Sequence, residues 1–222
     1  MNKYITFNDT SIKFQGNKLI KKFKLKTIPE KYKNIVSYYI YQYHKKLNKI
    51  GVPVPALYHR KNLKFTFENC GESLIEILKN KSLKDEFIND VLDQIVNILL
   101  KCSSNKVDLD PHIKNFTIKD NTVYYVDTFP PMVKDYIKLL VKYNSENKIN
   151  VRKHLSTWKY NRLMYHFLAD IKKTKSLNKK IYYEGKKLIL KKRLIRNFSD
   201  KKINDIIKIE GSNLKRIGFT LS

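Results

Sequence analysis

The residues of this chain best suited to chemistry are a carboxylate and an amide on one short segment, followed by a second carboxylate. Asp110 opens the segment Asp-Pro-His-Ile-Lys-Asn, Asn115 closes it, and Asp127 follows the apolar run Val123–Val126. A carboxylate can accept a proton from a hydroxyl group, and carboxylate and amide oxygens suit Mg²⁺. Groups of these types could carry out most of a phosphoryl transfer, in which positioning and charge dominate.

The composition of the chain indicates a globular protein with an extreme positive charge, whose secondary-structure elements must position these groups. Of its 222 residues, 42% are hydrophobic, which is enough for a core in one large domain or two small lobes. The 46 basic residues outnumber 20 acidic ones, so the formal net charge is +26, and only six of the basic residues are arginine. Two interpretations stay open: a lysine-rich compositional bias, or a surface selected for an anionic partner such as RNA, glycolipid or membrane.

The cysteines and the apolar segments favour a cytoplasmic protein. Cys70 and Cys102 have no Cys-x-x-Cys spacing and no histidine close in sequence, so we expect neither a disulfide scaffold nor a zinc site. The N-terminus has no apolar region typical of a signal peptide, and apolar runs such as Ile98–Leu100 are too short to span a bilayer. Any membrane association is therefore expected to be peripheral.

The N-terminal part of the chain reads mainly as β-structure. Alternating apolar residues in Tyr4–Phe7, Ser11–Phe14 and Leu19–Phe23, separated by turn residues, predict a three-stranded antiparallel meander. Two further strands are predicted at Ala56–Tyr58 and Leu63–Phe67, after an extended proline-containing segment.

One helix is predicted within this part, from Glu30 to Asn48, and it ends before Gly51. Its expected apolar face consists of Ile35, Tyr39, Tyr43 and Leu47.

The second part of the chain reads mainly as helices. A hinge near Asn69–Gly71 separates two predicted lobes, residues 1–69 and 70–222. Helices are predicted at Ser73–Leu78, at Asp85–Lys101 and over most of the chain after Met132. The segment Ile118–Val126 predicts a β-hairpin with its turn at Asp120-Asn121, and Ile181–Leu190 is ambiguous between helix and hairpin.

This order of elements resembles the protein-kinase-like superfamily, in particular proteins of the aminoglycoside phosphotransferase type. The resemblance covers residues ~4 to 131 and rests on the strands, the helix, Gly51–Pro55, the hinge, Asp110 to Asn115 and Asp127. The catalytic segment Asp110–Phe116 is similar to that of lipopolysaccharide core heptose kinases, and Gly51–Pro55 resembles the small tRNA-associated kinases of the KEOPS complex. The resemblance implies an α+β, bilobal kinase-like fold with a small antiparallel β N-lobe and a mainly helical C-lobe.

The resemblance also implies roles for particular residues. Asp110 would be the catalytic base, Asn115 and Asp127 would bind Mg²⁺, and ATP would be the phosphoryl donor. The strand lysine that contacts the ATP phosphates would be Lys21 or Lys22; alternation places Lys21 with Leu19 and Phe23, and Lys22 on the opposite face. Further candidates for binding the nucleotide are Thr10 and Ser11 at the first turn, and Glu68 and Cys70 at the hinge.

The chain departs from the family pattern at several positions. The segment between the first strands lacks Gly-x-Gly-x-x-Gly. The ATP phosphates would therefore have to be bound by the turn from Asn8 to Ser11. The predicted helix has no acidic residue at mid-length that could pair with the strand lysine. Glu30 is at the start of the helix, and Gln42 is the polar acceptor near the position where the acidic residue is expected. Asp108 stands where relatives often carry histidine.

Three further features have both a functional and a structural interpretation. His112 could touch substrate or phosphate, or be structural. The aromatic and basic residues of 152–167 could bind nucleic acid, or form a buried helix face. The basic block Lys186–Arg196 could contact RNA or an anionic membrane, or be a solvated face.

From these residues we expect an ATP- and Mg²⁺-dependent phosphotransferase acting on a hydroxyl of a small molecule, sugar or glycolipid. The alternatives are a basic, RNA- or tRNA-associated kinase-like ATPase and a pseudokinase scaffold.

Overall fold

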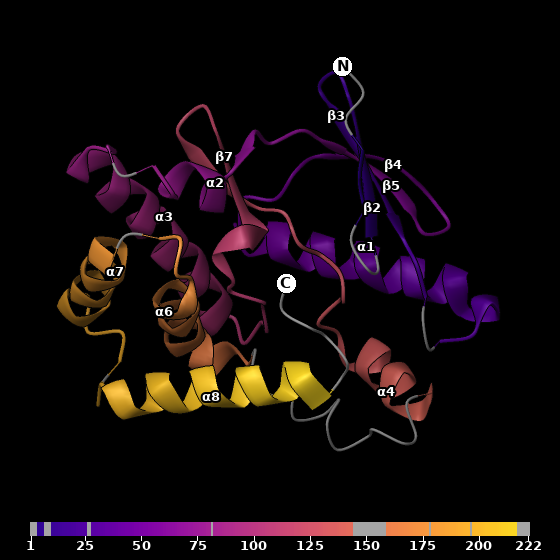
Figure 1. The fold of residues 1–222 in the computed structure, drawn as a ribbon. Helices are drawn as coiled ribbons and strands as arrows, with labels where there is room; N and C mark the ends of the chain where they lie inside the picture. The colour runs from indigo at the N-terminus through magenta and orange to yellow at the C-terminus, as the bar shows by residue number, and fades with distance from the viewer. Residues whose placement is uncertain are drawn as a thin grey trace. The chain divides into compact units, whose positions relative to one another are not determined.

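The structure is a computed structural model that describes residues 4–6, 10–25, 28–80, 82–143, 159–177, 179–195 and 197–216, with the backbone alone for 4–6 and 210–216. It confirms the predicted α+β class: an antiparallel sheet forms from the N-terminal part, and helices dominate after residue 72 (Figure 1).

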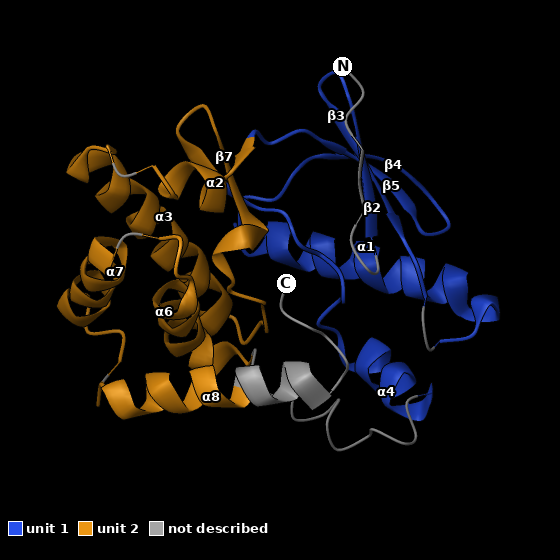
Figure 2. Ribbon diagram, in the orientation of Figure 1, with its two compact units in different colours: residues 1–71, 124–152 blue, residues 72–123, 153–222 orange. Residues whose placement is uncertain are grey.

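The chain forms two compact units that each contain two stretches of sequence (Figure 2). Unit 1 comprises residues 1–71 and 124–152, and unit 2 comprises residues 72–123 and 153–222. The predicted lobes, residues 1–69 and 70–222, differ from these units mainly because residues 124–143 belong with the N-terminal part. The chain passes from unit 2 back to unit 1 within one strand, between Val123 and Tyr124.

Unit 1 contains a five-stranded antiparallel sheet with the strand order β1-β2-β3-β5-β4. Its strands are β1 (Tyr4–Thr6), β2 (Thr10–Gln15), β3 (Lys18–Phe23), β4 (Leu57–Lys61) and β5 (Lys64–Glu68). The predicted meander is therefore confirmed. Gly16 supplies the positive φ of 55° that the turn between β2 and β3 requires.

Helix α1 (Lys33–Lys49) follows one short turn of 3-10 helix at Glu30–Tyr32. The predicted position of this helix is confirmed, and its predicted buried face is confirmed for Tyr43 and Leu47 but is wrong for Ile35. The buried residues are Val36, Ser37, Ile40, Tyr43, His44 and Leu47, whereas Ile35 is 39% exposed. The face is rotated because two polar side chains, Ser37 and His44, occupy positions that a purely apolar pattern does not count.

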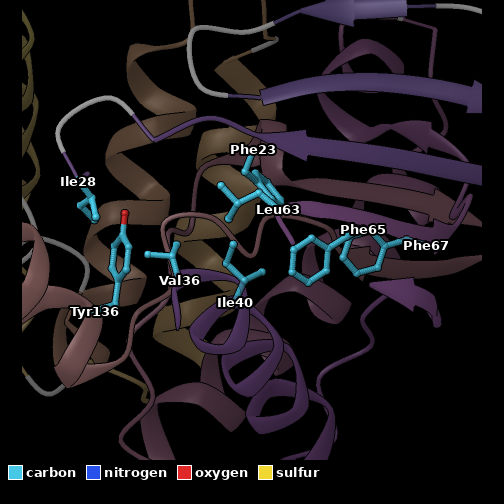
Figure 3. Close-up of a cluster of buried hydrophobic side chains, with 8 residues drawn as sticks. All are labelled: Phe23, Ile28, Val36, Ile40, Leu63, Phe65, Phe67 and Tyr136. Atoms are coloured by element: carbon cyan, nitrogen blue, oxygen red, sulfur yellow. The ribbon is translucent and has the colours of Figure 1, made fainter. Parts of the chain in front are cut away.

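A cluster of buried side chains joins α1 to the sheet and to α4 (Lys134–Tyr143) (Figure 3). Its members are Phe23, Ile28, Val36, Ile40, Leu63, Phe65, Phe67 and Tyr136. The rings of Phe65 and Phe67 stack with their centroids 5.8 Å apart. Because Phe23 points into this cluster, strand alternation directs the side chains of Leu19 and Lys21 to the same face of β3.

Unit 2 contains most of the helices and most of a small sheet, whose strand β8 continues into unit 1. The sheet has the order β6-β7-β8, formed by Glu72–Ser73, Phe116–Lys119 and Thr122–Tyr125. The predicted hairpin is confirmed: Asp120 and Asn121 form its turn with φ of 50° and 59°, as a type I′ turn requires.

The helices of unit 2 are α2 (Leu74–Leu78), α3 (Asp85–Ser104), α6 (Leu163–Lys173), α7 (Lys179–Lys191) and α8 (Asp200–Arg216), with short 3-10 turns at Ile113–Asn115 and Tyr160–Arg162. The ambiguous segment Ile181–Leu190 is thus helical. Its buried residues, Ile181, Gly185 and Ile189, recur at helical spacing, and a Cβ on Gly185 would lie 3.6 Å from a methyl group of Leu168. Among the described helices, none combines the length and apolarity needed to cross a membrane.

Candidate functional site

The first group of candidate residues lies in unit 1, around the buried side chain of Lys21. Lys21 is 8% exposed, and its Nζ donates a hydrogen bond to the backbone oxygen of Val126 over 2.5 Å. Burial lowers the pKa of its ammonium group, and the negative charge of the Asp127 carboxylate opposes this shift. Lys21 and Asp127, two of the candidate residues, therefore interact through their charges within unit 1.

The helix residue expected near Lys21 was Gln42, which is half-buried, but the residue of α1 whose pKa the charge of Lys21 affects is His44. Its Nε2 lies 2.9 Å from the backbone oxygen of Pro55, so Nε2 carries the proton because a carbonyl oxygen can only accept. Burial lowers the pKa of His44, the bond to Pro55 opposes that shift, and the charge of Lys21 adds to it. Glu30 instead lies on the surface, 3.7 Å from Lys33.

Asp127 is held by the chain on both sides of it. The strand β8 ends at Tyr125, whose backbone N–H donates to the oxygen of Pro53 over 2.9 Å. After it, the N–H of Phe129 donates to Oδ1 of Asp127 over 3.2 Å. The ring of Phe129 stacks on that of Phe23, with centroids 4.9 Å apart. These contacts fix the carboxylate to the same core that orients Lys21.

The second group lies in unit 2, where Asp110 and Asn115 are joined within one loop. Both are buried, at 8% and 5% exposure. Nδ2 of Asn115 donates to the backbone oxygen of Asp110 over 3.2 Å, and the Asn115 N–H donates to the oxygen of His112 over 2.9 Å. The Asn115 amide thus closes the loop that Asp110 opens, and its side-chain oxygen takes no part in that bond.

His112 makes direct contact with the Asp110 carboxylate through Nδ1. Burial on its own would raise the pKa of Asp110, but the charge and hydrogen bond of His112, with contributions from Lys114 and Asn115, hold that pKa below its ordinary value. Asp110 is therefore a carboxylate at neutral pH. His112 thus has a structural contact with Asp110, and its contact with substrate or phosphate stays a prediction.

Two residues of α6 complete this group, and sequence reasoning missed both. Asp170 is 5% exposed and accepts a hydrogen bond of 2.7 Å from the backbone N–H of Ile113 through Oδ2. Lys173 lies 3.4 Å from Asp170 and 3.3 Å from Nε2 of His112. Asp170 anchors the loop from outside. The available signal was a lone acid within the apolar run Leu163–Ile171.

Other residues singled out from the sequence have structural contacts. Asp108 accepts a hydrogen bond from the backbone N–H of Tyr160 over 2.9 Å, at the start of a 3-10 turn. Of the residues in 152–167, positions 152–158 lie outside the described part. Phe167 is buried in α6, as the buried-face interpretation predicts, whereas Arg162 is exposed.

The remaining candidates for nucleotide binding are dispersed over unit 1. Lys22 is exposed and alternates to the face opposite Lys21, with Ser11 directly across from it on β2. Thr10 lies opposite Phe23, on the face of Lys21. Glu68 ends β5, and Cys70 is buried at 3% exposure. The other residues of the proposed phosphate turn, Asn8 and Asp9, lie outside the described residues.

The basic block Lys186–Arg196 is partly neutralised within unit 2. Nζ of Lys186 lies 2.8 Å from Asp200, and Nζ of Lys192 lies 2.6 Å from Asp93. Arg196 lies outside the described residues. Two of the charges in this block thus have acidic partners in the fold.

Comparisons with known proteins return distant structural similarity. No protein-family model and no curated protein sequence matches this chain. The chain is similar to a choline/ethanolamine kinase family protein from Mesorhizobium loti, with 10% identity and a TM-score of 0.37, over 99% of this chain and 90% of that one. It is similar to the choline kinase LicA from Streptococcus pneumoniae, with 12% identity and a TM-score of 0.35, over 97% and 94% of the two chains.

A third similar structure is that of WbdD, with 12% identity and a TM-score of 0.39, over 84% of this chain but 50% of that chain.

Proposed function

We propose that this protein is an ATP- and Mg²⁺-dependent phosphotransferase that moves the γ-phosphoryl group to a hydroxyl of a small molecule, sugar or glycolipid. Lys21 binds the nucleotide phosphates, and Asn115 and Asp127 are the Mg²⁺ ligands. Asp110 accepts or steers the proton of the acceptor hydroxyl. Bound Mg²⁺ neutralises negative charge on the phosphates.

The observation that carries the proposal is the burial of Lys21 next to Asp127. In a chain with 46 basic residues, an ammonium group that is 8% exposed stands out because burial disfavours its charge. One of its donors is used on Val126, and an ammonium group has three. The remaining donors suit phosphate oxygens, which would also compensate the cost of burying the charge.

The donor atoms available fit the cofactor. Mg²⁺ is bound in proteins by one or two carboxylates, with waters and phosphate oxygens completing its octahedron. Asp127 and Asn115 offer a carboxylate and an amide oxygen. Nζ of Lys21 donates to the carbonyl oxygen of Val126 and experiences the negative charge of Asp127, and neither interaction involves an acidic residue in α1.

Asp110 suits the role of steering a proton. Its lowered pKa keeps it ionised at neutral pH, which a proton acceptor requires. A carboxylate with a low pKa holds a proton weakly, so we assign it chiefly to orienting the acceptor hydroxyl. The hydrogen bonds of Asn115 and Asp170 keep the loop that carries it in one conformation.

Calorimetric titration of ATP into the protein, with Mg²⁺ and then with EDTA, tests the proposal. We expect binding with Mg²⁺ and its loss in EDTA; no binding in either condition would overturn the proposal. Transfer of labelled γ-phosphate to a panel of sugars, amino alcohols and glycolipids then identifies the acceptor. Asp110→Asn should abolish transfer while ATP binding persists.

A nucleotide-binding scaffold without transfer is the second candidate. The observation that favours it is His44, because the residue of α1 whose pKa the charge of Lys21 affects is an imidazole and not an acid. Mg²⁺-dependent ATP binding without transfer to any acceptor in the panel, and without ATP hydrolysis, would select this candidate.

A further inference from the structure

Three lysines lie side by side across the face of the unit 1 sheet that is turned away from the cluster of Figure 3. Lys22 on β3 is directly opposite Lys64 on β5, and Lys64 is directly opposite Lys61 on β4. We call Lys22, Lys64 and Lys61 the lysine row. Ser11 on β2 extends it, because Ser11 is directly opposite Lys22.

This arrangement is unfavourable for the isolated protein. Directly opposite residues on antiparallel strands have Cβ atoms about 4.5–5.5 Å apart, and like charges at that distance destabilise a sheet. All three lysines are exposed, and within the described residues none forms an ion pair with an acid. Lysines on the helices behave differently: Lys33, Lys79 and Lys138, for example, each pair with an acid three residues earlier.

The surroundings of the lysine row add positive charge and one aromatic ring. Lys13 and Lys18 alternate to the same face, and Glu68 lies opposite Lys18. Ser11, Lys13, Ile20, Lys22 and Lys64 border a depression of about 240 Å³. Tyr58, at the irregular point of β4, is 51% exposed, and Nζ of Lys18 lies 6.0 Å from its ring centroid.

We propose that the lysine row and its surroundings bind single-stranded RNA through the phosphate backbone. Neighbouring strands are about 4.8 Å apart, so the row presents ammonium groups along a line of about 10 Å, which suits successive phosphates. Tyr58 offers a ring on which a base can stack. Lysine ammonium groups act as point charges on phosphates, so binding is expected to depend little on base sequence.

The composition of this face favours RNA over an anionic membrane. Proteins that lie on membranes bury a broad apolar face in the lipid, and this sheet face offers chiefly lysines around a half-buried Ile20. The site is separate from the proposed phosphotransferase residues, because Lys21 and Lys22 point to opposite faces of β3. RNA binding at this face is therefore independent of the proposed function.

The test is the fluorescence anisotropy of a labelled oligouridylate titrated with the protein at several salt concentrations. The variant Lys22→Gln/Lys61→Gln/Lys64→Gln neutralises the lysine row. The matched control is Lys179→Gln/Lys187→Gln/Lys191→Gln, which removes three exposed lysines from α7. Counterion release gives a slope of about 0.7 per phosphate contact on single strands, so loss of three contacts should reduce the slope of log K against log salt by about 2.

At 0.1 M salt, a reduction of the slope by about 2 corresponds to an RNA affinity about a hundredfold lower for the row variant than for the unaltered protein. The control should bind within a few-fold of the unaltered protein. Equal binding by the row variant and the unaltered protein overturns the proposal, as does loss of binding in the α7 control alone. Binding to phosphatidylglycerol vesicles with none to RNA also overturns it, in favour of a membrane surface.

A stability measurement checks the premise without any ligand. Removal of the like charges should raise the midpoint of thermal unfolding of the row variant at low ionic strength, and added salt should reduce the difference. A lower midpoint for the row variant would mean that the lysines stabilise the free protein, which would remove the reason to expect an anionic partner.

Discussion

Replacing Asp127 by asparagine should destabilise the protein through Lys21. The substitution preserves the size of the side chain but removes the negative charge that opposes the burial cost of the Lys21 ammonium. Breaking a fully buried ion pair costs about 3–5 kcal/mol, and an exposed pair is worth about 0–1 kcal/mol. Because Lys21 is buried and Asp127 is half-buried, we expect a loss of about 1–3 kcal/mol.

The double variant isolates the interaction. In Lys21→Met the ammonium group is absent, so adding Asp127→Asn to this variant should cost little further stability. The coupling energy between the two substitutions should therefore be about 1–2 kcal/mol, measured from urea unfolding at pH 7. The control pairs Lys22→Met with Asp127→Asn, and its coupling should be near zero because Lys22 lies on the opposite face of β3.

The reasoning would be refuted if Asp127→Asn destabilised the protein equally with and without Lys21. Effects that add within about 0.5 kcal/mol are those of independent sites.

Three further predictions concern single residues. Because burial sets the pKa of folded His44 below its ordinary 6.5, the unfolded chain binds the proton first as pH falls. The free energy of unfolding should then decrease below pH 6.5 by at most about 1.4 kcal/mol per pH unit. The variant His44→Gln keeps a hydrogen-bond donor to Pro55 and should remove this pH dependence. Urea unfolding at several pH values measures both effects. Asp170→Ala should leave the buried N–H of Ile113 without its acceptor and lower the free energy of unfolding by about 1–3 kcal/mol. Hydrogen exchange at the Ile113 amide should become faster in Asp170→Ala, whereas Asp170→Asn should retain most of the protection of that amide. Phe65→Ala should cost about 3–5 kcal/mol in calorimetric unfolding because its side chain is fully buried, and Tyr58→Ala should change stability little.

The elements that the sequence predicted correctly are those with a strong local signal. The meander and the hairpin at Asp120-Asn121 combine strand periodicity with residues that accept positive φ. The buried face of α1 was predicted only in part, because Ile35 is apolar but exposed, and His44 is polar but buried. Burial of His44 depends on the carbonyl of Pro55, which belongs to a later segment.

The residues of the candidate site also divide into those that local sequence predicts and those that only tertiary packing reveals. Asp110, Asn115 and Asp127 follow from spacing, and alternation along one strand places the two candidate lysines, Lys21 and Lys22, on opposite faces. Asp170 contacts Ile113 across 57 residues of sequence, so only tertiary packing reveals it. The lysine row also requires strand order and register, because Lys22 and Lys64 are far apart in the sequence and adjacent in the sheet.

The central claim is that Lys21 of unit 1 binds the phosphates of ATP, and the most direct test compares two neighbouring lysines. ATP with Mg²⁺ is titrated calorimetrically into Lys21→Met and into Lys22→Met, each checked for folding by circular dichroism. We predict that Lys21→Met weakens ATP binding at least tenfold, and that Lys22→Met binds as the unaltered protein does. Equal affinities in the two variants would contradict the claim.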